Sequence, residues 1–218
     1  MVPIGIISVL TGNTHVKRLS RLMSTAPIKL QKQAPPRERI LAAASDLFYR
    51  HGIRAVGVDA IAEAAGTNKM TLYRHFDSKD ELVAEYLRHL AAQSDLVWQE
   101  IAQKRPGDPH AQLDAWLEAM AGHIANTDER GCPLANAAIE LPEKNHPARP
   151  VIETFKKGQR ERLAELCRTA GLSQPELVAD ELFLLLEGAR VSTQSVGHGG
   201  PGCSFIRMGR ALISGHSA

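Results

Sequence analysis

The sequence predicts an all-α protein, with a three-helix N-terminal head and a C-terminal helical bundle. Apolar residues recur every three to four positions beyond residue 35, strand-like alternation is absent, and capping residues separate the periodic segments. The 218 residues are 44% hydrophobic and 23% charged, a composition typical of a soluble globular chain. The longest apolar run, Val2 to Leu10, falls short of the roughly 20 residues that span a bilayer. We therefore expect a cytoplasmic protein with no membrane partner.

Residues 1–33 show no sustained period, and we expect a disordered extension or a misassigned start, since Met23 resembles an ordinary bacterial start. Up to Lys79 there are 12 Lys+Arg against 5 Asp+Glu, and beyond it 14 against 19. This asymmetry indicates a polyanion at the N-terminal end. The extension is either a solvated tail or a second binding arm, and it carries Lys17, Arg18, Arg21, Lys29 and Lys32.

Start and stop residues divide residues 34–94 into helices. Gly52 suits the left-handed position that ends a helix, Asn68 can cap a helix, and Ser78-Lys-Asp-Glu81 is a capping box. Pro35 and Pro36 suit the first turn of the first of these helices, where a backbone N–H is unpaired anyway. The predicted helices run from Pro36 to His51, from Val58 to Ala65, from Lys69 to His75 and from Lys79 to about Gln103.

The second and third of these helices match a helix-turn-helix that spans Gly57 to Phe76. Three alanines, Ala62, Ala64 and Ala65, allow the helices to cross closely, and Gly66 supplies the positive φ of the turn. With Leu72 and Phe76 pointing inward, the outer face is rich in donors of the kind that contact phosphates and base edges. The alternative is a helical hairpin with a solvated face. The candidate DNA-binding residues are Asn68, Lys69, Met70, Thr71, Tyr73, Arg74, His75 and Lys79.

Residues 95–218 continue the helical period as one C-terminal domain. Ser173-Gln-Pro-Glu176 has the pattern of a second capping box, and residues 197–202 form a glycine-rich connector without a phosphate-binding motif. Predicted helices run from Asp108-Pro109 through Ile124, from Cys132 to Leu141, from Pro150 to Arg168, from the Ser173 box to about Ser195, and from Cys203 to Ser214. The last two carry small and apolar residues suited to an interface: Gly188, Ala189, Ser192, Ile206, Ala211 and Leu212.

The segments Ile61-Ala-Glu-Ala-Ala-Gly66, Lys69-Met-Thr-Leu-Tyr-Arg-His-Phe76 and Ser78-Lys79 closely resemble the TetR family of bacterial repressors, over about residues 36–85. The resemblance implies a homodimer that binds a double-stranded DNA operator through its head. It also implies a divergent C-terminal domain that binds a small-molecule effector and dimerises through its last two long helices. No cofactor is implied, and activation instead of repression stays open.

The resemblance assigns roles by position. Gly57 stands where Ser or Thr usually caps and touches phosphate, so we expect that contact to be lost. Met70 replaces the usual Gly, Ala or Pro and can meet a thymine methyl. Lys69 and Met70 sit where family members approach bases, and Thr71, Tyr73, His75 and Lys79 sit where they contact phosphates.

The identity of the effector does not follow from the resemblance, because the C-terminal domain matches only in length and helix rhythm. Pockets in such bundles are apolar with a few polar groups. Large residues on apolar stripes are therefore pocket candidates, although each also suits a plain core: Trp98, Trp116, Met120, His123, Phe155 and Leu184.

Cys132 follows Gly131 at a predicted helix start, where the helix dipole lowers a thiol pKa. It is a candidate redox sensor, with a buried inert cysteine as the alternative. The three cysteines form no CxxC and the nine histidines no i, i+4 pair, so we expect no metal site. Without GxSxG or SxxK we expect no enzyme. The alternative function is a helical small-molecule-binding protein or enzyme whose head no longer binds DNA.

Overall fold

The computed structural model describes residues 34–125, 130–197 and 199–217. Over these ranges the chain forms nine α-helices and one 3₁₀ helix, with no strand, which confirms the all-α prediction. The predicted N-terminal extension, residues 1–33, lies outside the described residues. In the described part, every helix is too short or too polar to cross a bilayer.

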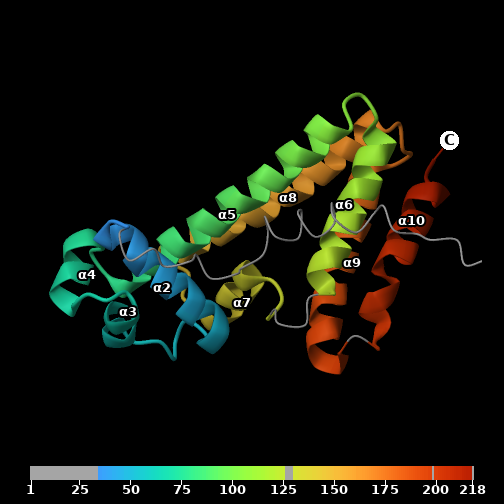
Figure 1. The fold of residues 1–218 in the computed structure, drawn as a ribbon. Helices are drawn as coiled ribbons and strands as arrows, with labels where there is room; N and C mark the ends of the chain where they lie inside the picture. The colour runs from blue at the N-terminus through green and yellow to red at the C-terminus, as the bar shows by residue number, and fades with distance from the viewer. Residues whose placement is uncertain (1–33, 126–129, 198, 218) are drawn as a thin grey trace, which may run out of the picture.

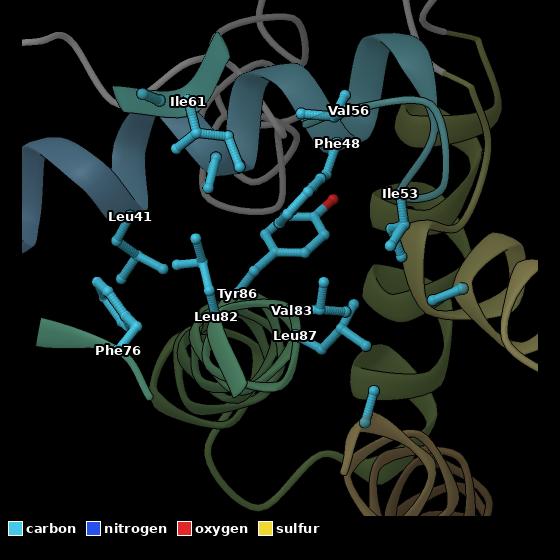
Figure 2. Packing of buried hydrophobic residues seen from close by; sticks show 14 of the residues in the cluster. Leu41, Phe48, Ile53, Val56, Ile61, Phe76, Leu82, Val83, Tyr86 and Leu87 are labelled. Carbon is cyan, nitrogen blue, oxygen red and sulfur yellow. The ribbon is translucent and has the colours of Figure 1, made fainter. Parts of the chain in front are cut away.

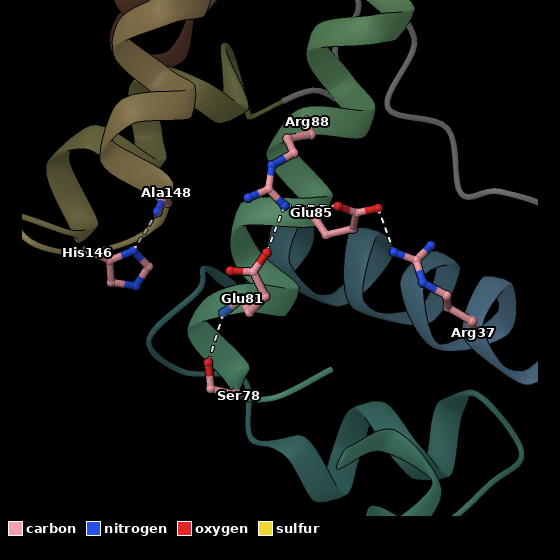
Figure 3. Close-up of polar contacts among 7 residues, drawn as sticks. All are labelled: Arg37, Ser78, Glu81, Glu85, Arg88, His146 and Ala148. Atoms are coloured by element: carbon pink, nitrogen blue, oxygen red, sulfur yellow. Dashed lines mark hydrogen bonds and ion pairs between the residues drawn. The ribbon is translucent and has the colours of Figure 1, made fainter. Parts of the chain in front are cut away.

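Four helices at the N-terminal end begin and end within one residue of their predicted bounds: α2 (Pro36–His51), α3 (Val58–Ala64), α4 (Lys69–His75) and α5 (Lys79–Lys104). Gly52 ends α2 with φ at 87°. The Ser78 hydroxyl caps α5 by accepting the Glu81 N–H at 3.1 Å, and the Glu81 carboxylate accepts from Arg88 two turns further on (Figure 3).

The C-terminal elements are α6 (Pro109–Ile124), α7 (Pro133–Glu140), α8 (Ala148–Thr169), α9 (Pro175–Val196), η1 (Pro201–Ser204) and α10 (Phe205–Gly215). Helix α8 starts two residues before Pro150, because proline is tolerated in a first turn. The His146 Nδ1 accepts the Ala148 N–H at 3.1 Å at this start (Figure 3).

The prediction of a capping box at Ser173 is wrong. The residue before α9 is Gln174, in the left-handed conformation with φ at 55°, and no side chain caps the helix. The Ser173 hydroxyl instead donates to the His216 carbonyl at 3.1 Å, and its N–H donates to the same oxygen at 2.8 Å. Ser173 therefore ties the end of α10 to the start of α9.

The helices form a head and a bundle linked by two long helices (Figure 1). Helices α2, α3 and α4 make the head, and α5 runs away from it alongside α8. At the far end α6, α9 and α10 pack together, and the short α7 lies between head and bundle. This arrangement makes α5, α7 and α8 the connections through which the two ends contact each other.

Two hydrophobic clusters form the core. The bundle cluster centres on Trp116, which packs edge-on against Phe205 with ring centroids 6.1 Å apart. The head cluster surrounds Phe48 and Tyr86 (Figure 2), whose ring centroids are 5.7 Å apart. The head cluster does not stop at the proposed boundary after residue 94. It also takes in buried residues of α7 and α8 and their flanks: Cys132, Leu134, Ala137, Leu141, Ala148 and Ile152.

Candidate nucleic-acid interface

The turn between α3 and α4 is a Schellman motif. Gly66 has φ at 62°, its N–H donates to Glu63, and the Thr67 N–H donates to the Ala62 carbonyl, both at 2.9 Å. Ala62 and Ala65 are buried at the crossing, whereas Ala64 is exposed. The close approach of the helices therefore depends on two of the three alanines that the sequence suggested.

Helix α4 presents one side to the core of the head and the opposite side to solvent. Leu72 is fully buried and Phe76 nearly so, while Met70 on the opposite side is 79% exposed. The Asn68 side-chain oxygen caps the helix by accepting the Thr71 N–H at 2.9 Å. The structure thus brings the predicted contact residues together on one exposed face, with Thr71 half-buried beside them: Lys69, Met70, Tyr73, Arg74 and His75.

Lys69 is paired within the head. Its Nζ lies 3.4 Å from the Asp59 carboxylate of α3, and both side chains are exposed. Such a surface pair contributes little to stability. The pair matters because the lysine has to leave Asp59 before it reaches a base edge, and a spacing of ten residues gave no sign of it in the sequence.

Lys79 lies apart from the exposed face of α4. Its half-buried side chain lines a surface cavity of about 380 Å³ together with Arg54, Glu143 and His146. Burial lowers the pKa of this lysine, and the nearby carboxylates of Asp80 and Glu140 partly offset that effect. The residue that the resemblance assigns to phosphate contact therefore stands between the head and the junction of α7 with α8.

Arg37 of α2 contacts both Glu85 of α5 and the ring of Phe76. The sequence pattern did not indicate this role. The Arg37 guanidinium donates to Glu85 at 2.7 Å (Figure 3) and lies 5.1 Å from the centre of the Phe76 ring. The hydrogen bond from Arg37, together with one from Arg88, lowers the pKa of the Glu85 carboxyl. The partners are 48 residues apart, so no local pattern could reveal the contact.

Polar contacts also join the head to α7. The Arg54 Nε donates to the Glu140 carbonyl at 2.6 Å, and another of its nitrogens donates to the Glu143 carboxylate at 2.6 Å. Arg130 donates to the Tyr49 carbonyl at 3.0 Å. Any displacement of α7 therefore acts on the end of α2 and the loop that follows it.

The bundle brings four of the six pocket candidates together. Trp116 and Met120 are buried in the bundle core, His123 is buried one turn further along α6, and Trp98 stacks on Trp116 with ring centroids 6.3 Å apart. The Trp98 Nε1 donates to Gln159 at 2.9 Å. Phe155 lines a separate groove of about 620 Å³ between α5 and α8. Leu184 joins neither group, because its side chain is 69% exposed on α9.

Cys132 is the buried residue before α7, and the Lys156 ammonium donates to its Sγ at 3.6 Å. Cys167 is also buried, and Cys203 is exposed. Over the described ranges, no three His, Cys, Asp or Glu side chains come close enough to hold a metal ion. The fold thus gives the Cys132 thiol a cationic neighbour that its sequence position did not reveal.

Known proteins share these features. Residues 40–86 match the family described as bacterial regulatory proteins, tetR family. The helix-turn-helix transcriptional regulator YjdC of Escherichia coli is 25% identical over 152 residues, which cover 70% of this chain and 80% of YjdC. The transcriptional activator FasR of Mycolicibacterium smegmatis is 47% identical over 100 residues, 45% of this chain and 44% of FasR.

The likeness extends to the whole fold. The crystal structure of SCO4454, a TetR-family transcriptional regulator from Streptomyces coelicolor, superposes with a TM-score of 0.79 at 25% identity and covers 87% of this chain and 98% of SCO4454. The matched head, the Schellman turn and the exposed face of α4 agree with that likeness. The head therefore matches that of the tetR family of bacterial regulatory proteins, and the chain as a whole has the fold of a TetR-family transcriptional regulator.

Proposed function

We propose that this protein is a homodimeric repressor that binds a pseudo-palindromic operator and releases it when a small-molecule effector binds the bundle. The observation that carries the proposal is the exposed face of α4. Leu72 anchors this seven-residue helix to the core of the head, and every other large side chain on the helix is exposed.

The chemistry of that face suits a duplex. Lys69, Arg74 and His75 offer nitrogen donors, and Tyr73 offers a hydroxyl that can donate to a phosphate oxygen. The exposed Met70 methyl can contact a thymine methyl in the major groove. Phosphate contacts would set the position of the head, while Lys69 and Met70 would distinguish base pairs.

An apolar stripe on α9 supports the homodimer. Leu177, Leu184 and Val191 are exposed and spaced seven residues apart, so they share one side of the helix. Gly188 lies between the last two and has open space around it, which permits a close approach. Met208 adds an exposed apolar side chain on α10. An exposed stripe of this kind is typical of a self-complementary interface.

The last two helices differ from what the resemblance implied in one respect. Helix α10 has 11 residues, half the length of the 22-residue α9, and Ala189 is buried within its own chain. The interface we propose therefore uses mainly the exposed side of α9. The twofold axis would present the two α4 helices about 34–36 Å apart, one turn of duplex.

Selection of bound fragments from a genomic library tests the proposal. We expect one pseudo-palindromic site, bound by a dimer, with affinity that falls steeply as salt rises because counterions are released from the phosphates. A weak salt response and no enriched fragment would favour a helical small-molecule-binding protein whose head no longer binds DNA. Transcription in vitro from the selected site separates repression from activation, and FasR is an activator.

A further inference from the structure

Two cations of the bundle share one carboxylate between α8 and α9. The Lys156 Nζ lies 2.6 Å from Glu187 Oε2, and an Arg190 Nη lies 3.2 Å from Glu187 Oε1. The side chains are only 21%, 15% and 27% exposed for Lys156, Arg190 and Glu187. The cluster therefore holds one excess positive charge in a largely enclosed place.

The remaining donors of the two cations face weak acceptors. The second Nη of Arg190 donates to the Met120 sulfur at 3.7 Å, and apart from Glu187 and Met120 no partner of this guanidinium is found in the described part of the chain. The Lys156 ammonium faces the Cys132 sulfur at 3.6 Å and lies 5.5 Å from the centre of the Phe183 ring. Thiol and thioether sulfurs are poor acceptors, so both cations keep capacity for a stronger one.

The same two helices also carry an ion pair in which the positive and negative charges balance. Arg160 of α8 directs two nitrogens to both carboxylate oxygens of Asp180 on α9. One guanidinium there has one carboxylate to itself. Arg190 and Lys156, by contrast, share the single carboxylate of Glu187, and the half-buried ring of Phe183 lies beside them.

We propose that Lys156 and Arg190 bind the carboxylate of a small organic acid whose apolar part lies against Phe183. A carboxylate matches the planar fork of an arginine and supplies the missing negative charge. The inference rests on the proposed function, since it names the chemical class of the effector. The site touches Cys132 at the start of α7, and α7 is the helix whose far end contacts the head.

Calorimetry and thermal unfolding of the purified full chain without DNA test the site. The probes are benzoate, phenylacetate and octanoate, each compared with its uncharged primary amide. At least one acid should bind and raise the unfolding temperature, and its amide should not. Arg190→Gln and Lys156→Gln should each weaken binding of that acid roughly tenfold or more, as expected for loss of a charge-assisted hydrogen bond.

Two further variants separate a binding role from a structural one. Glu187→Gln removes the competing carboxylate and should tighten acid binding severalfold. Arg160→Gln, on the same two helices, should bind the acid like the wild type. The proposal is overturned if no acid binds better than its amide, if Arg190→Gln keeps wild-type affinity, if Glu187→Gln weakens binding, or if Arg160→Gln weakens it as much as Arg190→Gln. None of these measurements involves DNA. If the wild-type protein binds its operator but binds no acid better than the matching amide, the acid site is refuted and the proposed DNA-binding function is not.

Discussion

The carboxylate of Glu140, the last residue of α7, accepts a hydrogen bond from the backbone N–H of Ile53 at 2.6 Å, across 87 residues of sequence. The same oxygen accepts the Arg54 N–H at 3.2 Å. A Cβ on the preceding residue, Gly52, would lie 3.1 Å from this carboxylate, and the φ of 87° there also favours glycine. The end of α2 and the end of α7 therefore form one joint.

Replacing Glu140 by Ala should lower the free energy of unfolding by about 2 kcal/mol, because two backbone N–H groups lose a charged acceptor. Glu140→Gln keeps one acceptor oxygen and should lose less. Urea unfolding measures both. Glu143→Gln, which breaks only the half-exposed pair with Arg54, should change stability by less than about 0.5 kcal/mol. Equal losses for Glu140→Ala and Glu143→Gln would show that the two hydrogen bonds to the Glu140 carboxylate contribute no more to stability than a surface ion pair.

Gly57→Ser should stabilise the protein by a few tenths of a kcal/mol, since a serine hydroxyl can cap α3. Gly57 is the N-cap residue with φ at −86°, and a Cβ there meets nothing within 4 Å. The new hydroxyl should also raise affinity for operator and random DNA alike, if it reaches a phosphate. Thermal unfolding and binding titrations measure the two effects.

The matched control for this change is Gly66→Ser. Because Gly66 has φ at 62°, a serine there should cost about 1 kcal/mol. A loss of stability in Gly57→Ser as large as that in Gly66→Ser would contradict the proposed cap.

Lys69→Ala should weaken operator binding by about 1–3 kcal/mol and random-DNA binding by less, if the lysine leaves Asp59 for a base edge. Asp59→Asn frees the same ammonium and removes a negative charge, so it should tighten operator binding. Tyr73→Phe is the control, with a loss of about 1 kcal/mol on both DNAs from one phosphate donor. Equal loss on both DNAs for Lys69→Ala would assign specificity to Met70, Arg74 or DNA shape.

Leu184→Glu should convert the dimer to a monomer at micromolar concentration, because it places a charge at the centre of the exposed α9 stripe. Light scattering measures the mass, and operator affinity should fall with it. Ile139→Glu replaces an equally large, exposed side chain on α7 and should leave the dimer intact. A dimeric Leu184→Glu would move the interface away from α9.

Stability should fall between pH 9 and 11 because of Cys167. Burial, with a smaller effect from Glu176, raises the pKa of this thiol from 9.0 to about 11. As pH rises, the thiol ionises first in the unfolded chain, so the folded state loses up to about 2 kcal/mol by pH 10.5. Urea unfolding at pH 8 and 10.5 should show a smaller drop for Cys167→Ala than for wild type.

Burial also raises the pKa of Tyr86, but that residue contributes equally to both proteins. Cys203→Ala, at an exposed thiol, should keep the wild-type pH dependence. The same drop in Cys167→Ala as in wild type would exclude this thiol as its source.

Local signals account for what the sequence predicted well. Gly66, Asn68 and Ser78 act through hydrogen bonds to residues three positions away, so the bounds of α3, α4 and α5 follow from a short window of sequence. Ser173 shows the limit of such windows, because its hydroxyl found a partner at the end of α10 instead of its own helix. The pairing of Lys69 with Asp59 likewise depends on how two helices cross.

The sensor end was harder to predict for the same reason. The cluster of Lys156, Glu187 and Arg190 requires two helices that meet side by side, and each residue alone looks like an ordinary charge on a helix surface. The apolar stripe that carries Leu184 predicts a pocket position for it, but α9 has apolar residues on two sides. Only the packing of α8 against α9 shows which side stays exposed.

The shared core of head and α7 limits how this regulator can be recombined with others. A hybrid joined within α5, after residue 94, would carry Tyr86 and Leu87 without the side chains of Leu134, Ala137 and Ile152 that belong to the same cluster. Such a graft would leave this side of Tyr86 and Leu87 uncovered unless the recipient supplies side chains of matching size. A working chimaera has to transplant α7 and the first two turns of α8 together with the head, even though they come from distant parts of the chain.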